Sequence, residues 1–285
     1  MTAANGVKPE TGATVASVLR RCMANVVGAL KALAHPARIH SQTPWLLARR
    51  QLAVAAAVFA GVFLIGMILI DAAAINAVVR LPRWLITTFD EITDFGKSGW
   101  FLWPLGILFL ALAALPQNLT RTSQLVLAAV MVRVGFLFVA VAVPGLFVTI
   151  VKQMIGRARP LTIGTADPYV FNPFTWGAAY ASLPSGHAAT AFSVLVAFGT
   201  LWPRARAVLL IYALLIAASR IVVTAHYPTD VLAGAVVGIA GALIVRHWFA
   251  LRRFGVSVGL DGVLHQYPGP SLKRIKSVAR ELLAQ

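Results

Sequence analysis

Residues 52–70 read LAVAAAVFAGVFLIGMILI, nineteen consecutive residues without a charged side chain. At a rise of 1.5 Å per residue, a helix of this length spans about 30 Å, the thickness of the hydrocarbon layer of a bilayer. We therefore predict that this stretch crosses a membrane as an α-helix. This stretch decides the fold class, because an uncharged apolar run of this length is typical of a membrane-spanning helix.

Further apolar stretches of similar length follow at residues 99–115, 126–150, 186–202, 207–223 and 229–245. Between the first two spans, residues 71–99 carry ionisable side chains, so we expect short helices at the membrane surface there. Of the 285 residues, 59% are hydrophobic and 12% are charged, whereas a soluble domain has about a quarter charged residues. We predict an all-α, polytopic membrane helix bundle of about six transmembrane helices with short interfacial helices. A soluble domain and a disordered chain are excluded.

The chain divides into three predicted parts. Residues 1–50 form a cytoplasmic basic tail with an amphipathic helix, residues 51–250 form the six-span domain, and residues 251–285 form a second cytoplasmic basic tail. Apolar residues recur at helical spacing between Val15 and Leu33. This helix either rests on the anionic leaflet or packs on the body of the protein, and the pattern favours neither reading.

The chain is strongly basic, with 25 Lys and Arg against 9 Asp and Glu and a net charge of +16. No aromatic-basic interleaving or nucleic-acid motif accompanies this charge, so we do not expect a nucleic-acid partner. Seventeen of the 25 basic residues fall on one side if residues 1–50 and 246–285 and the turns at 116–124 and 203–206 lie together. The positive-inside rule then predicts a multi-pass protein of the inner (plasma) membrane with both termini in the cytoplasm. Three loops would face the periplasm or the cell exterior: 71–99, 151–184 and 224–228.

Polar and ionisable residues gather at the predicted outer ends of the spans. Charged residues at membrane depth are costly and suggest function. A structural ion-pair cluster is the alternative, but only Asp167 and Asp230 are available nearby to balance several cations. An excess of sheltered positive charge favours an anion, and phosphate is the natural candidate. The gathered residues are Lys152, Arg157, Arg159, Ser185, His187, Arg220, His226 and Asp230.

Spacing indicates how two of the groups could hold a phosphate. Lys152 and Arg159 are seven residues apart, which is two helical turns, so both could line one face of a helix before Pro160 ends it. Ser185 and Gly186 lie where the fourth span begins. Free backbone N–H groups at a helix start make an anion cradle, and glycine permits close approach.

The two histidines predict phosphoryl-transfer chemistry. His226 precedes Asp230 by four residues, and Pro228 between them favours a helix start. Asp230 would then reach back to His226, fix its tautomer and leave the other ring nitrogen free to attack. His187 lies on another helix and can donate a proton to the leaving oxygen.

In this order and spacing, these residues resemble the three-part signature of the type 2 phosphatidic-acid phosphatases, relatives of glucose-6-phosphatase and the vanadium haloperoxidases. The matching motifs are Lys152-x6-Arg159-Pro160, Pro184-Ser185-Gly186-His187 and Ser219-Arg220-x5-His226-x3-Asp230. The resemblance implies that residues 51–250 form a phosphatase domain that works without metal through a phosphohistidine. It implies His226 as the nucleophile, Asp230 as its orienting partner and His187 as the general acid. It implies phosphate binding by Lys152, Arg159, Ser185, Gly186 and Arg220.

We expect a phosphohydrolase that acts on a phosphomonoester or pyrophosphate of a membrane lipid. Candidate substrates are a polyprenyl pyrophosphate, phosphatidylglycerophosphate, phosphatidate or a lipid A phosphate. A lipid-to-lipid phosphotransferase with the same site and a non-catalytic lipid-phosphate binder or transporter are the alternatives. No cofactor is expected. Cys22 is the only cysteine, so neither an intrachain disulfide nor a thiolate metal site is expected. The sequence leaves the oligomeric state open.

Overall fold

The computed structural model describes residues 15–34, 48–116, 118–259 and 264–284. Parts of both predicted tails therefore lie outside the described residues. The described helices and strands are α1 (Val15–Ala34), α2 (Arg49–Leu69), α3 (Asp71–Val78), α4 (Arg83–Asp94), α5 (Gly99–Ala114), α6 (Arg121–Ile155), η1 (Ala178–Tyr180), α7 (Gly186–Leu201), η2 (Pro203–Ala205), α8 (Arg206–Val222), α9 (Pro228–Leu251), β1 (Val256–Val258), β2 (Leu264–Gln266) and α10 (Leu272–Leu283).

The described helices confirm the prediction of a polytopic membrane bundle. Within the described ranges, five segments are long and apolar enough to cross a membrane by length and composition: α2, α4 with α5, α6, η2 with α8, and α9. The remaining predicted span, 186–202, corresponds to α7. This helix is apolar but has only 16 residues, so it is shorter than the others. In residues 71–99, where short helices were expected, the chain forms α3 and α4, and α4 continues the candidate span of α5.

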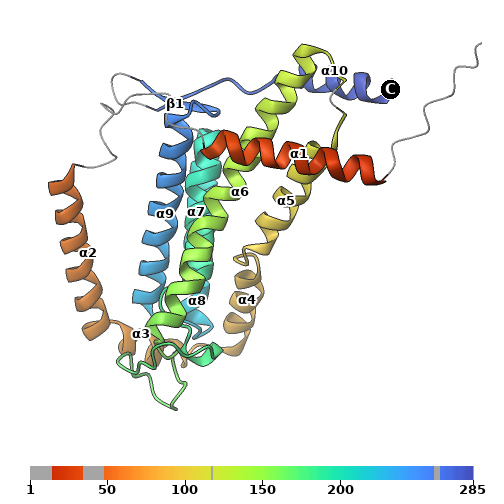
Figure 1. The fold of residues 1–285 in the computed structure, drawn as a ribbon. Coiled ribbons are helices and arrows are strands. Elements are labelled where there is room, and N and C mark those ends of the chain that lie inside the picture. The colour runs from red at the N-terminus through yellow and green to blue at the C-terminus, as the bar shows by residue number, and fades with distance from the viewer. Residues whose placement is uncertain (1–14, 35–47, 117, 260–263, 285) are drawn as a thin grey trace, which may run out of the picture.

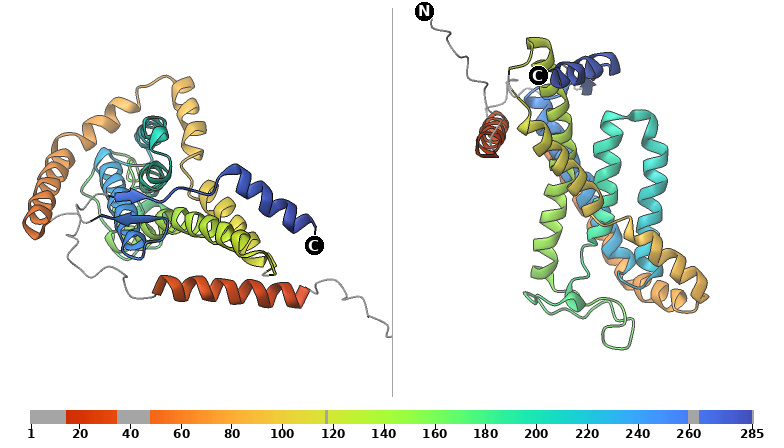
Figure 2. Two further views of the ribbon diagram at one scale, coloured as in Figure 1. Left: turned by 90° about the horizontal axis from the view of Figure 1, so that it is seen from above. Right: turned by 90° about the vertical axis from the view of Figure 1, so that its right-hand side faces the viewer.

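Helix α7 lies at the centre of the bundle and packs against α6, α8 and α9 (Figure 1). Its position explains its composition, because ten of its residues are buried and most of these are small. Helix α2 stands apart from this group and approaches it at Gly66, close to the Thr229 side chain (Figures 1 and 2). Because the buried side chains of α7 are small, α6, α8 and α9 can pack close to it. This packing also brings together the ends of these helices that carry the polar residues.

Close packing of α9 on α7 depends on glycine. A Cβ atom at Gly238 would collide with the backbone carbonyl of Ala189, and one at Gly234 would collide with that of Ser185. Small residues of this kind let membrane helices approach each other closely.

Gly238→Ala is therefore expected to destabilise the protein by about 1–3 kcal/mol, the usual cost of overpacking a core. Thermal unfolding in detergent measures the effect. Gly61→Ala is the matched control, because nothing lies within 4 Å of a Cβ atom at Gly61 in α2. Equal unfolding temperatures for both variants would contradict the close α7–α9 packing.

The two ends of the bundle differ in what they carry. Helices α1 and α10 and strand β1 lie at one end, whereas α3, α4 and the loop after α6 lie at the other (Figure 1). Helix α1 packs on α5, where the Asn25 side-chain amide donates to the carbonyl of Ala113 at 2.7 Å. Leu19 and Met23 of α1 stay exposed. The helix thus contacts the body of the protein and still presents an apolar face outward.

Candidate active site

Arg157 is completely buried and joins two carboxylates at the end of the bundle that carries α3 and α4. Its Nη2 lies 2.7 Å from Oδ2 of Asp71, and its Nη1 lies 2.6 Å from Oδ1 of Asp230. The same guanidinium donates to Oγ1 of Thr229 at 2.9 Å and to the carbonyl of Pro168 at 3.0 Å. Arg157 is thus fully neutralised and is part of the framework rather than a free cation.

Asp71 is the residue of this network that the sequence analysis missed. It begins α3 directly after the first span, is completely buried, and accepts a hydrogen bond from the backbone N–H of Thr229 at 3.0 Å. Its only signal in the sequence is an acidic residue that directly follows nineteen apolar ones. The structure gives this position a partner 86 residues away in Arg157.

The expected helical face shared by Lys152 and Arg159 is not present. Helix α6 ends at Ile155, and Gly156 takes the left-handed conformation with φ of 63°. Only glycine suits this turn, because a Cβ atom there would also collide with the carbonyl of Asn172. The spacing argument was therefore wrong, since the chain leaves the helix and carries Arg159 into the following loop.

The three sequence motifs meet around Asp230. The backbone N–H of Ser182 donates to the carbonyl of Arg157 at 3.1 Å, and its hydroxyl donates to Oδ2 of Asp230 at 2.6 Å. The backbone N–H of Ser185 donates to the carbonyl of Asp230 at 2.9 Å. One buried carboxylate residue thereby connects the ends of α6, α7 and α9.

His226 is buried in the short loop between α8 and α9, and its backbone N–H donates to the carbonyl of Arg220 at 3.2 Å. Its Nδ1 lies 3.9 Å from Oδ2 of Asp230, which is longer than a hydrogen bond. The carboxylate of Asp230 is instead hydrogen-bonded by Arg157, Ser182 and the backbone N–H of Tyr227. The Asp230 carboxylate therefore lies next to the His226 ring but does not hydrogen-bond to it.

The environment of His226 favours a neutral imidazole. Burial, together with the positive charges of Arg220 and Arg159, lowers the pKa of His226 well below its ordinary value of 6.5. A neutral imidazole retains the lone pair that a nucleophile needs.

A cavity of about 570 Å³ opens beside this cluster. Its polar wall includes Lys152, Gly186 and His187, and Lys97 lies at the same rim in an exposed ion pair with Asp94 at 2.7 Å. The apolar part of the lining comes from α5 and α6 and includes Leu102, Val143 and Leu146. The cavity thus joins a cationic end to an apolar face of the membrane helices.

Arg220 and Arg159 add unsatisfied donors close to His226. Nη1 of Arg220 donates to Oγ1 of Thr93 at 2.6 Å, which makes α4 a further contributor that the sequence analysis did not single out. Among the described residues, the buried Nε atoms of Arg220 and Arg159 have no hydrogen-bond partner. Buried donors without partners require an explanation, and an anion that binds between them provides one.

Ser185 and Gly186 start α7 as predicted. Ser185 is the N-cap residue, and its side-chain oxygen accepts from the backbone N–H of Ala188 at 3.5 Å. A Cβ atom at Gly186 would meet only the Val148 side chain, at 3.9 Å. The hydroxyl of Ser185 therefore serves its own helix start, while Gly186 leaves room at the wall of the cavity.

The described part of the chain contains no group of three or more His, Cys, Asp or Glu side chains that could hold a metal ion. The charge that can face a phosphate comes from Lys152, Arg159 and Arg220. With a neutral imidazole beside them, these cations make a site that can bind a phosphoryl group and attack it.

The sequence profile of the PAP2 superfamily matches residues 133–254. Two curated relatives from Rhizobium etli and Rhizobium johnstonii are named lipid A 1-phosphatase, and each is 34% identical to this chain. The first match covers 57% of this chain and 67% of the relative, and the second covers 56% and 66%. The crystal structure of Aquifex aeolicus LpxE is similar at a TM-score of 0.46 and 24% identity, over 62% of this chain and 94% of that chain.

Proposed function

This chain belongs to the PAP2 superfamily, and from that premise we propose that it is a membrane-embedded phosphatase that removes the 1-phosphate of lipid A. The observation that carries the proposal is the meeting of the three motifs at Asp230, through Arg157, Ser182 and Ser185. The two curated relatives named for that activity support the choice of substrate.

His226 is the proposed nucleophile. The free nitrogen of its neutral imidazole attacks phosphorus, a P–N bond forms, and the bond from phosphorus to the leaving oxygen of the lipid breaks. His187, on the wall of the cavity, gives that oxygen a proton, and the incoming phosphate dianion favours the protonated ring that this step requires. The dephosphorylated lipid leaves and the phosphohistidine remains.

Water then completes the reaction. His187, now neutral, takes a proton from a water molecule that attacks phosphorus, the P–N bond breaks, and inorganic phosphate and free His226 result. Throughout, Lys152, Arg159 and Arg220 hold the negative charge on the phosphoryl oxygens, and the free backbone N–H groups at the start of α7 assist them. Asp230 acts as a positioning residue that holds the His226 loop.

The cavity suits a lipid substrate. The phosphate would lie at the end with Lys152 and His187, and an acyl chain would lie along the apolar wall formed by α5 and α6. In the proposed topology this end faces the periplasm or the cell exterior, because most basic residues lie toward the end that carries α1 and α10.

A phosphate-release panel in detergent tests the substrate proposal. Purified protein is given lipid A 1-phosphate, lipid A phosphorylated only at the 4′ position, a polyprenyl pyrophosphate, phosphatidylglycerophosphate and phosphatidate. We expect kcat/KM for the 1-phosphate to exceed the others by about tenfold or more, a difference of about 1.4 kcal/mol in transition-state binding. Preference for another lipid would overturn the substrate, and transfer of the phosphate to an added lipid acceptor would identify a phosphotransferase.

Phosphate release is expected to persist in excess EDTA. Lys152, Arg159 and Arg220 supply the positive charge that stabilises the transition state, so the proposed steps need no divalent ion. The measurement compares initial rates with and without the chelator. Loss of activity that magnesium restores would contradict the proposal.

The lowered pKa of His226 predicts the pH profile. A pKa below 6.5 means that the imidazole stays neutral, and hence nucleophilic, as the pH falls through that value. We expect kcat/KM, corrected for ionisation of the substrate near pH 6, to show no acid limb at 6.5. Arg159→Gln removes a positive charge that lowers the pKa of His226, so in this variant the acid limb should lie at a higher pH than in the unmodified protein. An acid limb at 6.5 in the unmodified protein would contradict the described environment.

A further inference from the structure

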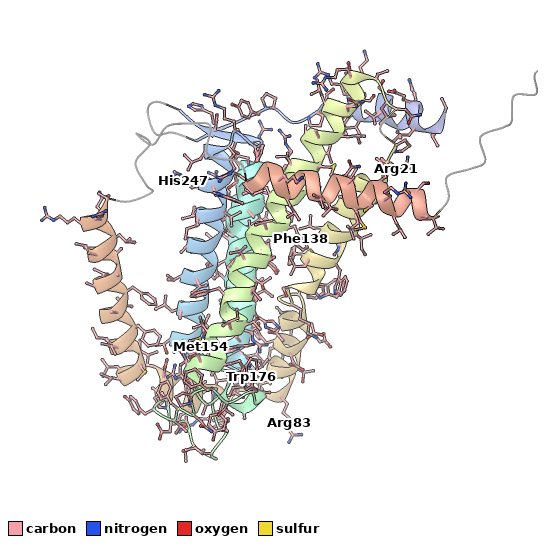
Figure 3. All side chains as sticks on the ribbon, in the orientation of Figure 1. Arg21, Arg83, Phe138, Met154, Trp176 and His247 are labelled. Atoms are coloured by element: carbon pink, nitrogen blue, oxygen red, sulfur yellow. The ribbon has the colours of Figure 1, made fainter. Side chains whose placement is uncertain are left out.

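A second cavity, of about 400 Å³, opens at the end of the bundle opposite the candidate active site, between α7, α8 and α9. Two arginines line it: Arg206 begins α8, and Arg246 lies near the end of α9. Arg246 adjoins His247, which Figure 3 places far from Trp176 and the loops of the active-site end. The proposed catalytic steps use none of the residues that line this cavity.

The charge of this cavity is unbalanced. Nε of Arg206 donates to the backbone carbonyl of Gly199 at 2.9 Å, and Arg246 forms no ion pair with any carboxylate among the described residues. Within the same part of the chain, the buried Nε of Arg246 has no hydrogen-bond partner. Two guanidinium groups at one cavity repel each other, and a buried donor without a partner is costly. An anion between the two arginines would offset both costs.

The remaining lining indicates what carries that anion. It is mostly apolar, with Leu195 from α7, Leu210 from α8 and Leu243 from α9. Leu210 is 43% exposed on a helix long and apolar enough to cross a membrane, so it faces lipid. A free phosphate makes no favourable contact with an apolar wall. A phospholipid, by contrast, can place its headgroup by the arginines and its acyl chain along the leucines. Basic pockets between membrane helices are known to bind anionic headgroups in this way.

The geometry points to a second lipid site, in which Arg206 and Arg246 hold the phosphodiester headgroup of an anionic phospholipid between α7, α8 and α9. The bound lipid would be a structural ligand that joins three helices at this end. A phosphodiester is also not the phosphomonoester on which the active site is proposed to act. The site therefore stands independently of the proposed function.

Native mass spectrometry of the full chain in detergent tests this site, with phosphatidylglycerol and phosphatidylcholine of matched acyl chains as probes. We expect phosphatidylglycerol to be retained in preference to phosphatidylcholine. Arg246→Gln and Arg206→Gln should each reduce the retained phosphatidylglycerol by about tenfold. Arg204→Gln is the matched control, because Arg204 is an exposed neighbour that does not line the cavity, and it should retain the lipid.

Three further arms make the result decisive. Arg246→Lys keeps the charge and should retain most of the lipid, so it separates loss of binding from loss of folding. Arg220→Gln at the active site should leave retention unchanged. Inorganic phosphate at millimolar concentration should not displace the lipid. The site is disproved by equal retention of the two lipids, by full retention in both glutamine variants, by loss of the lipid in Arg220→Gln or by displacement with phosphate.

Discussion

His226→Ala is expected to abolish phosphate release, with kcat lower by about 10⁴-fold or more. Loss of the proposed nucleophile would remove the covalent route altogether, and in enzymes whose catalytic groups act as a unit such losses reach this size. Only the cations and the backbone N–H groups would remain to stabilise a direct attack by water. The measurement is a single-turnover assay of lipid phosphate release in detergent, with detection of an acid-labile phosphoenzyme in the unmodified protein.

The control for this variant is His265→Ala, the same substitution in strand β2, which pairs with β1 at the far end of the bundle. We expect His265→Ala to keep nearly full activity and both variants to unfold at temperatures close to that of the unmodified protein. Near-normal turnover by His226→Ala would show that another group is the nucleophile. A phosphoenzyme that persists in His226→Ala would lead to the same conclusion.

The helices and their starts could be predicted from the sequence because these features depend on nearby residues. Long uncharged runs set the spans. The N-cap position of Ser185 and the first-turn position of Pro228 set the beginnings of α7 and α9 where they were expected. The helix starts next to His187 and His226 could therefore be predicted without any knowledge of tertiary contacts.

The partners of the site could not be predicted, because they come from distant parts of the chain. Asp71 reaches Arg157 across 86 residues, and Arg220 reaches Thr93 across 127. Nothing local marks either partner, since an acidic residue after a span and a threonine in an amphipathic helix are ordinary at a membrane surface. Arg157 could equally have been a flanking basic residue on the sequence alone.

One local expectation was also overruled by the fold. Lys152 and Arg159 have helical spacing, but Gly156 turns the chain out of the helix between them. The end of a helix thus limits what spacing alone can predict about two residues on either side of it. Helix α7, by contrast, covers Gly186–Leu201 and so agrees to within one residue with the span expected at 186–202.

Arg157→Met is expected to cost about 3–5 kcal/mol of folding free energy, because it leaves two buried carboxylates, Asp71 and Asp230, without their cation. In the protein that still folds, kcat should fall by a larger factor than KM rises. The reason is that a displaced Asp230 would disturb the His226 loop more than it would disturb the cations proposed to bind substrate. The measurement is unfolding in detergent combined with steady-state kinetics. Lys97→Met is the control, because its exposed ion pair with Asp94 is worth less than about 1 kcal/mol.

A double-mutant cycle separates the network from a general loss of packing. In the unmodified protein, Asp71→Asn removes one of the two negative charges that pair with Arg157 and should destabilise clearly. In the Arg157→Met background the same change removes a carboxylate that has already lost its cation, so it should cost little or even stabilise. A coupling of about 0.5–3 kcal/mol between the two positions is expected for residues in one buried network. Additive effects would mean that Asp71 and Arg157 contribute separately, and the buried link from the end of α2 to Asp230 would then have no energetic basis.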